Sequence, residues 1–199
     1  MSTTRKRNEA DLGGLLNAVA DGDREALAAL YQQVEGRVYA FALSRLGNAE
    51  AAQDLLHEVL LTVWRRAGSF QGRSRPLTWI LGIAHHKIID ALRKSNRWQE
   101  EPPDETAVDT GAPNPFEAVA DDQRRSAIRG ALEKLSDQHR QVIHLAFFED
   151  LPYTEIARIL EIPEGTVKTR MFHAKKTLQK RLRPQLGGTV GGTVGGTAS

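Results

Sequence analysis

Residues 153–176 read YTEIARILEIPEGTVKTRMFHAKK, a stretch that contains two short helical patterns joined by a tight connection. The first pattern covers about 153–161, and the second begins at residue 164. Apolar residues recur at helical spacing in both patterns, and Ile162 is placed to fill the turn between them. Two helices joined in this way are typical of a helix-turn-helix, which inserts its second helix into the major groove of DNA.

The second of these two helices combines an apolar stripe with a basic face. Between residues 164 and 183 there are seven basic residues and one acidic residue. Cationic side chains can donate to guanine edges, while Thr and Phe can touch thymine methyl groups. The candidate contacts to duplex DNA on this helix are Thr166, Lys168, Thr169, Arg170, Phe172, His173 and Lys176. On the preceding helix, Thr154 and Arg158 are candidates for phosphate contacts that fix the docking register. The alternative is a basic, solvated helix that only packs on its neighbours, but the short turn and the charge imbalance favour DNA binding.

The chain ahead of this unit follows the helical period up to about residue 94. Asp23 and Asn48 are placed to cap helices, Gly47 to end one, and Pro76 to occupy the first turn of another. A short first helix is expected over about 11–20, and no segment alternates convincingly as a strand. The expected fold class is all-α with two small helical domains, divided into an N-terminal extension (1–22), a first domain (23–96), an acidic Pro-containing linker (97–116), a helix-turn-helix domain (117–183) and a disordered Gly-rich tail (184–199).

Composition and charge narrow the possible functions of the 199 residues. The net charge is only +2, but residues 95–123 carry one basic and eight acidic residues between two basic blocks, which indicates a polyanionic partner. Cysteine is absent, so disulfide scaffolds and thiolate chemistry are excluded. No apolar run is long enough for a membrane span, and the N-terminus lacks a signal peptide, so a cytoplasmic protein without membrane insertion is expected.

Enzyme and metal chemistry find no support in the sequence. No glycine-rich phosphate loop and no nucleophile–base set is present, so no catalytic residues and no cofactor are expected. The pair His85-His86 invites a metal assignment. However, adjacent helical residues point about 100° apart and no carboxylate-rich spacing surrounds them, so no metal site is expected.

Several motifs together resemble the bacterial sigma factors of the extracytoplasmic-function (ECF) group, in the sigma-70 family. The segments DLLHEVLLTVW (54–64), PLTWILGIA (76–84) and IDALR (89–93) resemble the second conserved region of that group. The segments LSDQHRQVI (135–143), YTEIA (153–157) and EGTVKTR (164–170) resemble its fourth region. The resemblance covers about 23–96 and 117–183, and both sets of motifs occur in the family's order on either side of an acidic linker.

The resemblance implies that the first domain binds core RNA polymerase. Its docking residues would be Asp54, His57 and Glu58, placed on the clamp helices of the polymerase's largest subunit. Asp54 and Glu58 are four residues apart on one helical face, where they can receive arginines from a partner. His57 stands where the family usually has Gln. The alternative is that this is only a solvated acidic face.

The resemblance also implies that the first domain binds the non-template single strand of the minus-ten promoter element. The loop and helix that follow would supply Phe70, Arg73, Arg75, Trp79, His85, His86, Lys87 and Arg93. His85, His86 and Lys87 are expected to expose polar groups beside Arg93, as an electropositive track for single-stranded DNA. Trp79 has three open assignments: core residue, pocket wall or strand-separating wedge. His86 stands where the family usually has Asn.

The expected function is therefore a promoter-specificity subunit and not an enzyme. The helix-turn-helix would bind the double-stranded minus-thirty-five element, and His173 stands where the family often has Arg. The linker would thread the polymerase cleft, or else act as an inert spacer. An anti-sigma factor is expected as an inhibitory partner. The alternative function is a helix-turn-helix transcriptional regulator that does not join polymerase, and association with core polymerase distinguishes the two.

Overall fold

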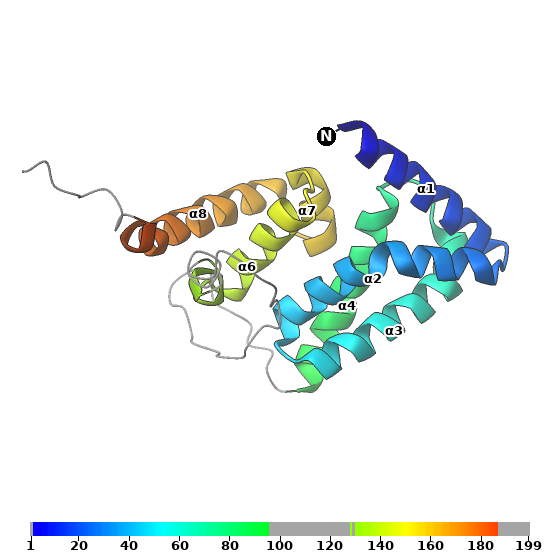
Figure 1. Ribbon diagram of the computed structural model, residues 1–199, viewed down its shortest axis with the longest axis horizontal. Helices are drawn as coiled ribbons and strands as arrows, with labels where there is room; N and C mark the ends of the chain where they lie inside the picture. The colour runs from blue at the N-terminus through cyan, green and yellow to red at the C-terminus, as the bar shows by residue number, and fades with distance from the viewer. Residues whose placement is uncertain (1, 96–127, 129, 187–199) are drawn as a thin grey trace, which may run out of the picture.

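The computed structural model describes residues 2–95, 128 and 130–186, and within those ranges every regular element is a helix (Figure 1). A helical front unit is followed by a smaller helical rear unit, which confirms the predicted all-α class. The front unit consists of α1 (Ser2–Ala20), α2 (Arg24–Leu46), α3 (Ala49–Arg66), the 3₁₀ turn η1 (Ala67–Ser69) and α4 (Pro76–Lys94). The rear unit contains α6 (Asp137–Ile143), the π-helical turn η2 (His144–Phe148), α7 (Tyr153–Leu160) and α8 (Glu164–Leu186).

The helix boundaries of the front unit follow the capping residues expected from the sequence. The Asp23 carboxylate accepts hydrogen bonds from the backbone N–H groups of Glu25 (2.8 Å) and Ala26 (3.1 Å) at the start of α2. Gly47 ends α2 in the left-handed conformation, with φ of 63°. The Asn48 side chain then accepts from Ala51 N–H at the start of α3. These local signals explain why α2 and α3 form an antiparallel pair with a connection of only two residues.

The front core is apolar and lies among all four helices. The helical stripes predicted from periodicity point into it, and its fully buried side chains include Leu30, Val34, Phe41, Val59, Leu77, Ile80, Leu81 and Ile88. The predicted first helix, expected from about residue 11, begins instead at Ser2. Its side chains Leu12, Leu16 and Val19 are buried in the same core. The segment predicted as an N-terminal extension (1–22) thus contributes α1 to the front unit.

The rear unit is built around the expected helix-turn-helix. Ile156, Ile159 and Leu160 of α7 and Val167, Met171 and Ala174 of α8 are buried between the helices. The turn places Glu161 in the left-handed region with φ of 54°, a conformation more usual for glycine. Ahead of the helix-turn-helix, α6 continues without a break into the π-helical turn η2. The helix α8 extends through Leu186, beyond the predicted start of the tail at residue 184.

Some predictions lie outside the described residues. These are the linker at 97–116, the start of the helix-turn-helix domain at 117, and the tail from residue 187.

The two units pack directly against each other (Figure 1). The C-terminal half of α2 lies against α6, and α4 lies against α7. The buried apolar residues of both units form one continuous cluster. The sequence predicts two domains but gives no indication of this contact, since its residues are far apart in the chain.

Candidate polymerase and nucleic-acid interfaces

The predicted polymerase-docking residues lie together on the exposed face of α3. Asp54, His57 and Glu58 are all exposed, as the amphipathic pattern requires. Glu58 Oε2 lies 3.0 Å from Lys87 Nζ on the neighbouring helix α4, so this carboxylate already has a partner within the front unit. Leu61 continues the same face and is 55% exposed. Leu61 was not predicted from the sequence. The available signal was an apolar residue three positions after Glu58 that lies outside the apolar stripe of the helix.

The loop before α4 and the first turn of that helix form an aromatic corner. The rings of Phe70 and Trp79 have centroids 5.5 Å apart and are tilted by 55°. Both side chains are partly buried and pack against the core. Trp79 therefore packs as a partial core residue, and its assignments as a pocket wall or a strand-separating wedge stay predictions. The side chain of Arg73 is exposed, and that of Arg75 is partly buried.

The prediction that His85 exposes a polar group is wrong. Its side chain is buried, with a relative exposure of 6%, because α4 packs against α1, α2, α3 and α7. Burial, together with the smaller effects of the nearby charges of Arg45 and His86, lowers the pKa of His85 from 6.5 to about 4. His85 is therefore a neutral interior side chain at physiological pH.

The other polar residues predicted on α4 do reach the surface. His86 is exposed, and its Nε2 lies 3.3 Å from Oε1 of Glu161 in the rear unit. Lys87 is half-buried and pairs with Glu58, whereas Arg93 is exposed near the end of the helix. The electropositive track is therefore narrower than expected, and part of it contacts the other unit.

The predicted duplex-reading face of α8 is open. Lys168, Thr169, Phe172 and Lys176 are exposed, while Thr166, Arg170 and His173 are partly buried. The His173 ring stacks on His139 of α6 at 6.2 Å, and Phe172 meets the edge of His173 at 5.4 Å. These ring contacts restrict the orientation of the Phe172 and His173 side chains.

Beside this face lies an exposed aromatic pair that sequence reasoning did not assign. Phe147 and Phe148 of the π-helical turn η2 are 62% and 63% exposed. The Lys175 Nζ lies 5.6 Å from the centroid of the Phe147 ring, a cation–π contact between η2 and α8. The two residues are the last two of the π-helical turn.

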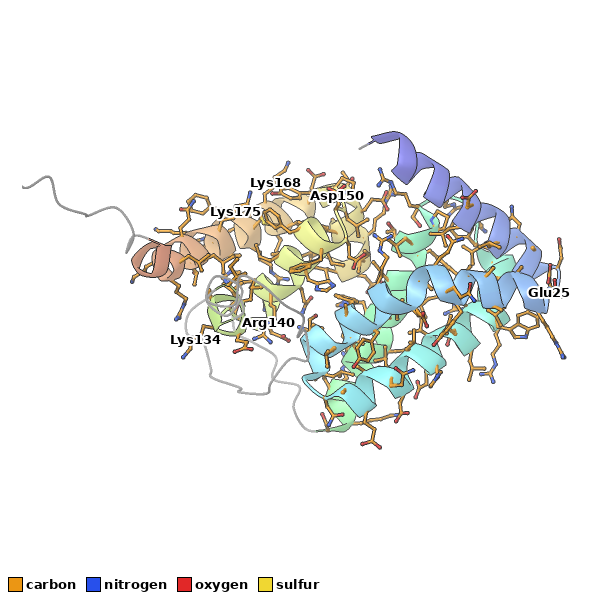
Figure 2. The ribbon with its side chains drawn as sticks, viewed as in Figure 1. Glu25, Lys134, Arg140, Asp150, Lys168 and Lys175 are labelled. Atoms are coloured by element: carbon orange, nitrogen blue, oxygen red, sulfur yellow. The ribbon has the colours of Figure 1, made fainter. Side chains whose placement is uncertain are left out.

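The phosphate-contact candidates on α7 differ from each other. Thr154 is exposed. Arg158 donates to Glu155 Oε1 at 2.9 Å and to the backbone carbonyl of Arg73 at 3.2 Å. Arg158 thus already bridges the rear unit to the loop before α4. Figure 2 shows side chains filling the space between the two units.

Within residues 2–95, 128 and 130–186 there is no cluster of three or more His, Asp or Glu side chains arranged to hold a metal ion. Among these residues, no helix combines the length and apolar character that crossing a membrane requires.

An exposed acidic helix face, an aromatic corner and a basic helix-turn-helix on an all-α scaffold are the features of a two-unit, DNA-binding transcription protein. Two family models match the chain: Sigma-70 region 2 over residues 30–98, and Sigma-70 region 4 over residues 125–178. The chain belongs to the ECF group of RNA polymerase sigma factors, as its similarity to curated members also shows.

Curated relatives match over most of their length. The ECF RNA polymerase sigma factor SigK of Mycolicibacterium vanbaalenii is 32% identical over 175 residues, which is 86% of this chain and 89% of the relative. The SigK protein of Mycobacterium bovis is 32% identical over 182 residues, which is 87% of this chain and 94% of the relative.

Solved structures support the fold. The sigma factor RpoE, in complex with the anti-sigma factor NepR from Bartonella quintana, superposes with a TM-score of 0.59 at 24% identity, over 77% of this chain and 94% of that one. CnrH, in complex with the cytosolic domain of CnrY, gives 0.62 at 20% identity, over 87% of this chain and 98% of that one.

As a sigma factor, the protein acts in transcription initiation with core RNA polymerase and promoter DNA. It is not itself an enzyme, because the polymerase carries out nucleotidyl transfer.

Proposed function

We propose that the front unit binds core polymerase and the melted minus-ten strand, and that the rear unit binds the minus-thirty-five duplex. The observation that carries this division is the separation of three different surfaces on the described residues. An acidic face lies on α3, an aromatic corner lies at the start of α4, and a basic face lies on α8.

The docking assignment rests on Asp54, His57 and Glu58. Exposed carboxylates on one helical face can receive arginines of a partner helix through charge-assisted hydrogen bonds. The Glu58–Lys87 contact is exposed on the Glu58 side, so a partner arginine can replace Lys87 at little cost. Leu61 adds an exposed apolar group beside the carboxylates.

The minus-ten assignment rests on Phe70, Trp79, His86 and the arginines of the preceding loop. A flipped base needs a pocket with an aromatic wall, and leaving the stack costs it a few kcal/mol. The corner formed by Phe70 and Trp79 supplies such a wall. The backbone phosphates of the strand would be held by Arg73, Arg75, Lys87 and Arg93. His85 is left out of this surface because its side chain is buried.

The minus-thirty-five assignment rests on the exposed face of α8. Lys168, Thr169, Arg170, Phe172 and His173 would reach base edges, and Thr166 and Lys176 would hold phosphates. Thr154 and Arg158 of α7 would fix the docking register, which requires Arg158 to leave its contact with Arg73.

The same proposal includes an anti-sigma partner and a cytoplasmic location. The support is the family membership together with a structural neighbour, the sigma factor RpoE, that is bound to an anti-sigma factor. The linker at 97–116 would set the separation of the two promoter elements.

The overall function is tested by mapping transcript starts after overexpression of the protein. Starts that share an upstream motif with two separated elements are expected, because both DNA-reading units would select them together. The absence of any shared motif would contradict the proposal.

The docking assignment is tested by reversing the charges of Asp54 and Glu58. Asp54→Arg with Glu58→Arg is expected to abolish co-migration with core polymerase on gel filtration while leaving the helical circular dichroism signal unchanged. The matched control is Glu25→Arg with Glu133→Arg, which makes the same charge change at exposed positions elsewhere. Unchanged polymerase affinity in the first variant would remove the docking assignment.

A further inference from the structure

The helix α6 contributes a ring to the surface of α8 that is assigned to duplex DNA. The two helices pack against each other within the rear unit (Figure 1). The centroid of the His139 ring on α6 lies 6.2 Å from that of the His173 ring on α8, and the two ring planes are tilted by only 20°. The Phe172 ring meets the edge of His173 at 5.4 Å. The His173 imidazole is therefore held by one ring from each helix, and we call these three residues the ring clamp.

The His139 part of the ring clamp stands on a fixed stretch of backbone. Ser136 caps α6, and its Oγ accepts a hydrogen bond from the His139 backbone N–H at 3.4 Å. The Arg140 guanidinium donates to the backbone carbonyls of Glu133 (3.1 Å) and Leu135 (3.2 Å), which ties the segment before α6 to the helix. Because the backbone on both sides of residue 139 is held, its ring gives a fixed support to the imidazole on α8.

Two neighbouring candidates on the same face are held in a different way. Lys168 Nζ lies 2.7 Å from Glu164 Oε1, and the Thr169 hydroxyl donates to the Gly165 carbonyl at 3.1 Å. Both of these contacts are made within α8. His173 is instead restrained by a residue of a second helix, which orients its ring relative to the rear unit. A side chain that is already ordered loses less freedom on binding, which is worth about 2- to 10-fold in affinity.

The chemistry of the imidazole limits what such a ring can read. A neutral imidazole has one N–H donor and one acceptor nitrogen. The two nitrogens point away from each other, so only one of them can face the edge of a base. In the major groove, N7 is the acceptor that guanine and adenine share. A single ring N–H therefore recognises a purine, without the second hydrogen bond that would separate guanine from adenine.

We propose that His173 donates to the N7 of a purine in the minus-thirty-five duplex, and that His139 is a specificity-determining residue that positions the His173 ring for this contact. This role of the ring clamp rests on the function proposed above for α8. His139 itself touches no DNA and acts through the His173 ring. A residue outside the helix-turn-helix thus sets the preference at one position of the promoter element.

The ring clamp is tested first without DNA. The imidazole proton signals of His173 are recorded by NMR on the full-length protein and assigned from their loss in His173→Gln. His139→Ala is expected to shift and broaden these signals, because the imidazole loses the neighbouring ring and gains rotational freedom. Gln138→Ala shortens the adjacent, partly buried residue of α6 and is the matched control, expected to leave the signals in place. Unchanged His173 signals in His139→Ala would overturn the clamp.

The contact to N7 is tested with chemically altered duplexes. The probe is the minus-thirty-five element found by transcript mapping, in which each purine in turn is replaced by its 7-deaza analogue. This analogue exchanges N7 for C–H and keeps the base pairing. Fluorescence anisotropy at about pH 8, above the usual titration range of histidine, is expected to show a position where the loss of N7 weakens wild-type binding by about 2- to 10-fold. His173→Ala is expected to bind the two duplexes of that position equally. A His173→Ala protein that is weakened equally on all duplexes would indicate a phosphate contact and would overturn the proposal.

The positioning role of His139 is tested at that same position. His139→Ala is expected to remove at least half of the penalty for losing N7, whereas His139→Phe, which keeps a flat ring, is expected to restore it. Gln138→Ala is expected to keep the wild-type penalty. A residue that only stabilises the rear unit would weaken binding of both duplexes by the same factor and leave their ratio unchanged. An unchanged ratio in His139→Ala would therefore contradict the positioning role.

The expected preference for either purine is tested by base exchange. In the wild-type protein, exchange of guanine for adenine at this position is expected to change affinity less than the loss of N7 does. His173→Arg is expected to favour guanine over adenine by about fivefold or more, because arginine donates to both O6 and N7 of guanine. A wild-type protein that already separates the two purines this strongly would overturn the single-donor contact.

The same titrations separate this inference from the function on which it rests. A wild-type protein that binds its element no better than a scrambled duplex would contradict the function proposed for α8. A wild-type protein that prefers its element but binds every 7-deaza duplex equally well would overturn only the role of His173 and His139.

Discussion

The two helices assigned to DNA, α4 and α8, differ in how much of their surface the fold leaves available. The helix α4 lies between other helices and buries eight residues, including the polar Thr78 and His85. The helix α8 lies at the edge of the rear unit, where Val167, Met171 and Ala174 are buried and a basic face is exposed. A helix at the edge can present a whole face to a duplex, whereas a central helix presents only what its neighbours leave uncovered.

The difference in burial predicts that truncating one side chain on each helix has a large effect on stability in α4 and a small one in α8. Ile80→Ala on α4 removes a fully buried side chain and is expected to lower the free energy of unfolding by about 2–5 kcal/mol. Phe172→Ala on α8 removes a side chain that is 63% exposed, and the unfolding free energy is expected to change by no more than about 0.5 kcal/mol. Urea denaturation followed by circular dichroism measures both. Similar losses in the two variants would abolish the distinction.

The buried histidine of α4 predicts a pH dependence of stability. Its pKa is about 4 in the folded protein and near 6.5 when unfolded, so the unfolded chain binds more protons between these values. The stabilisation is complete above pH 6.5 and is lost as the pH falls toward 4, by up to about 3 kcal/mol. Denaturation at several pH values measures this slope. His85→Gln is expected to flatten it, and an identical slope in the variant would show that other groups cause it.

The open face of α8 predicts a base-specific contact. Arg170→Ala is expected to weaken binding of the minus-thirty-five duplex by about 1–3 kcal/mol if the guanidinium reads a guanine. Fluorescence anisotropy with the wild-type duplex and with a duplex altered at that base pair measures the effect. An unchanged preference would move the reading to Lys168 or His173.

A smaller and sequence-independent effect is expected from the distal part of the same face. Lys176→Ala is expected to reduce the slope of log K against log salt by about one unit, as for the loss of one phosphate contact. Titrations at several salt concentrations measure it. A slope equal to that of the wild type would show that Lys176 does not contact phosphate, and the Arg170→Ala variant provides the comparison within α8.

Local patterns were sufficient to predict the helices and most of the core. Asp23, Gly47 and Asn48 predicted the boundaries of α2 and α3, because caps act through hydrogen bonds within a few residues. The apolar stripe of α8 also identified its exposed basic face. The exposure of Asp54 and Phe172 followed from the same periodicity.

The contacts between the units could not be predicted in this way. Arg37 and Glu149 are 112 positions apart in the chain, and the sequence around each of them does not predict that they form an ion pair. The burial of His85 follows from the packing around α4, so helical periodicity alone assigned it to the surface. Glu161 gave no sign of a left-handed turn, since that conformation is usually marked by glycine.

The helix α1 has a practical consequence for anyone who divides the chain into fragments. The match to the family model begins at residue 30, inside α2, whereas Leu12, Leu16 and Val19 of α1 are buried against the helices that follow. A methyl group built on Gly13 would lie 3.8 Å from Pro76, so α1 also passes beside the first turn of α4. A recombinant fragment that begins at the family boundary would lack α1. It would expose the apolar surface that Leu12, Leu16 and Val19 cover and would remove the neighbour of Pro76, which favours aggregation.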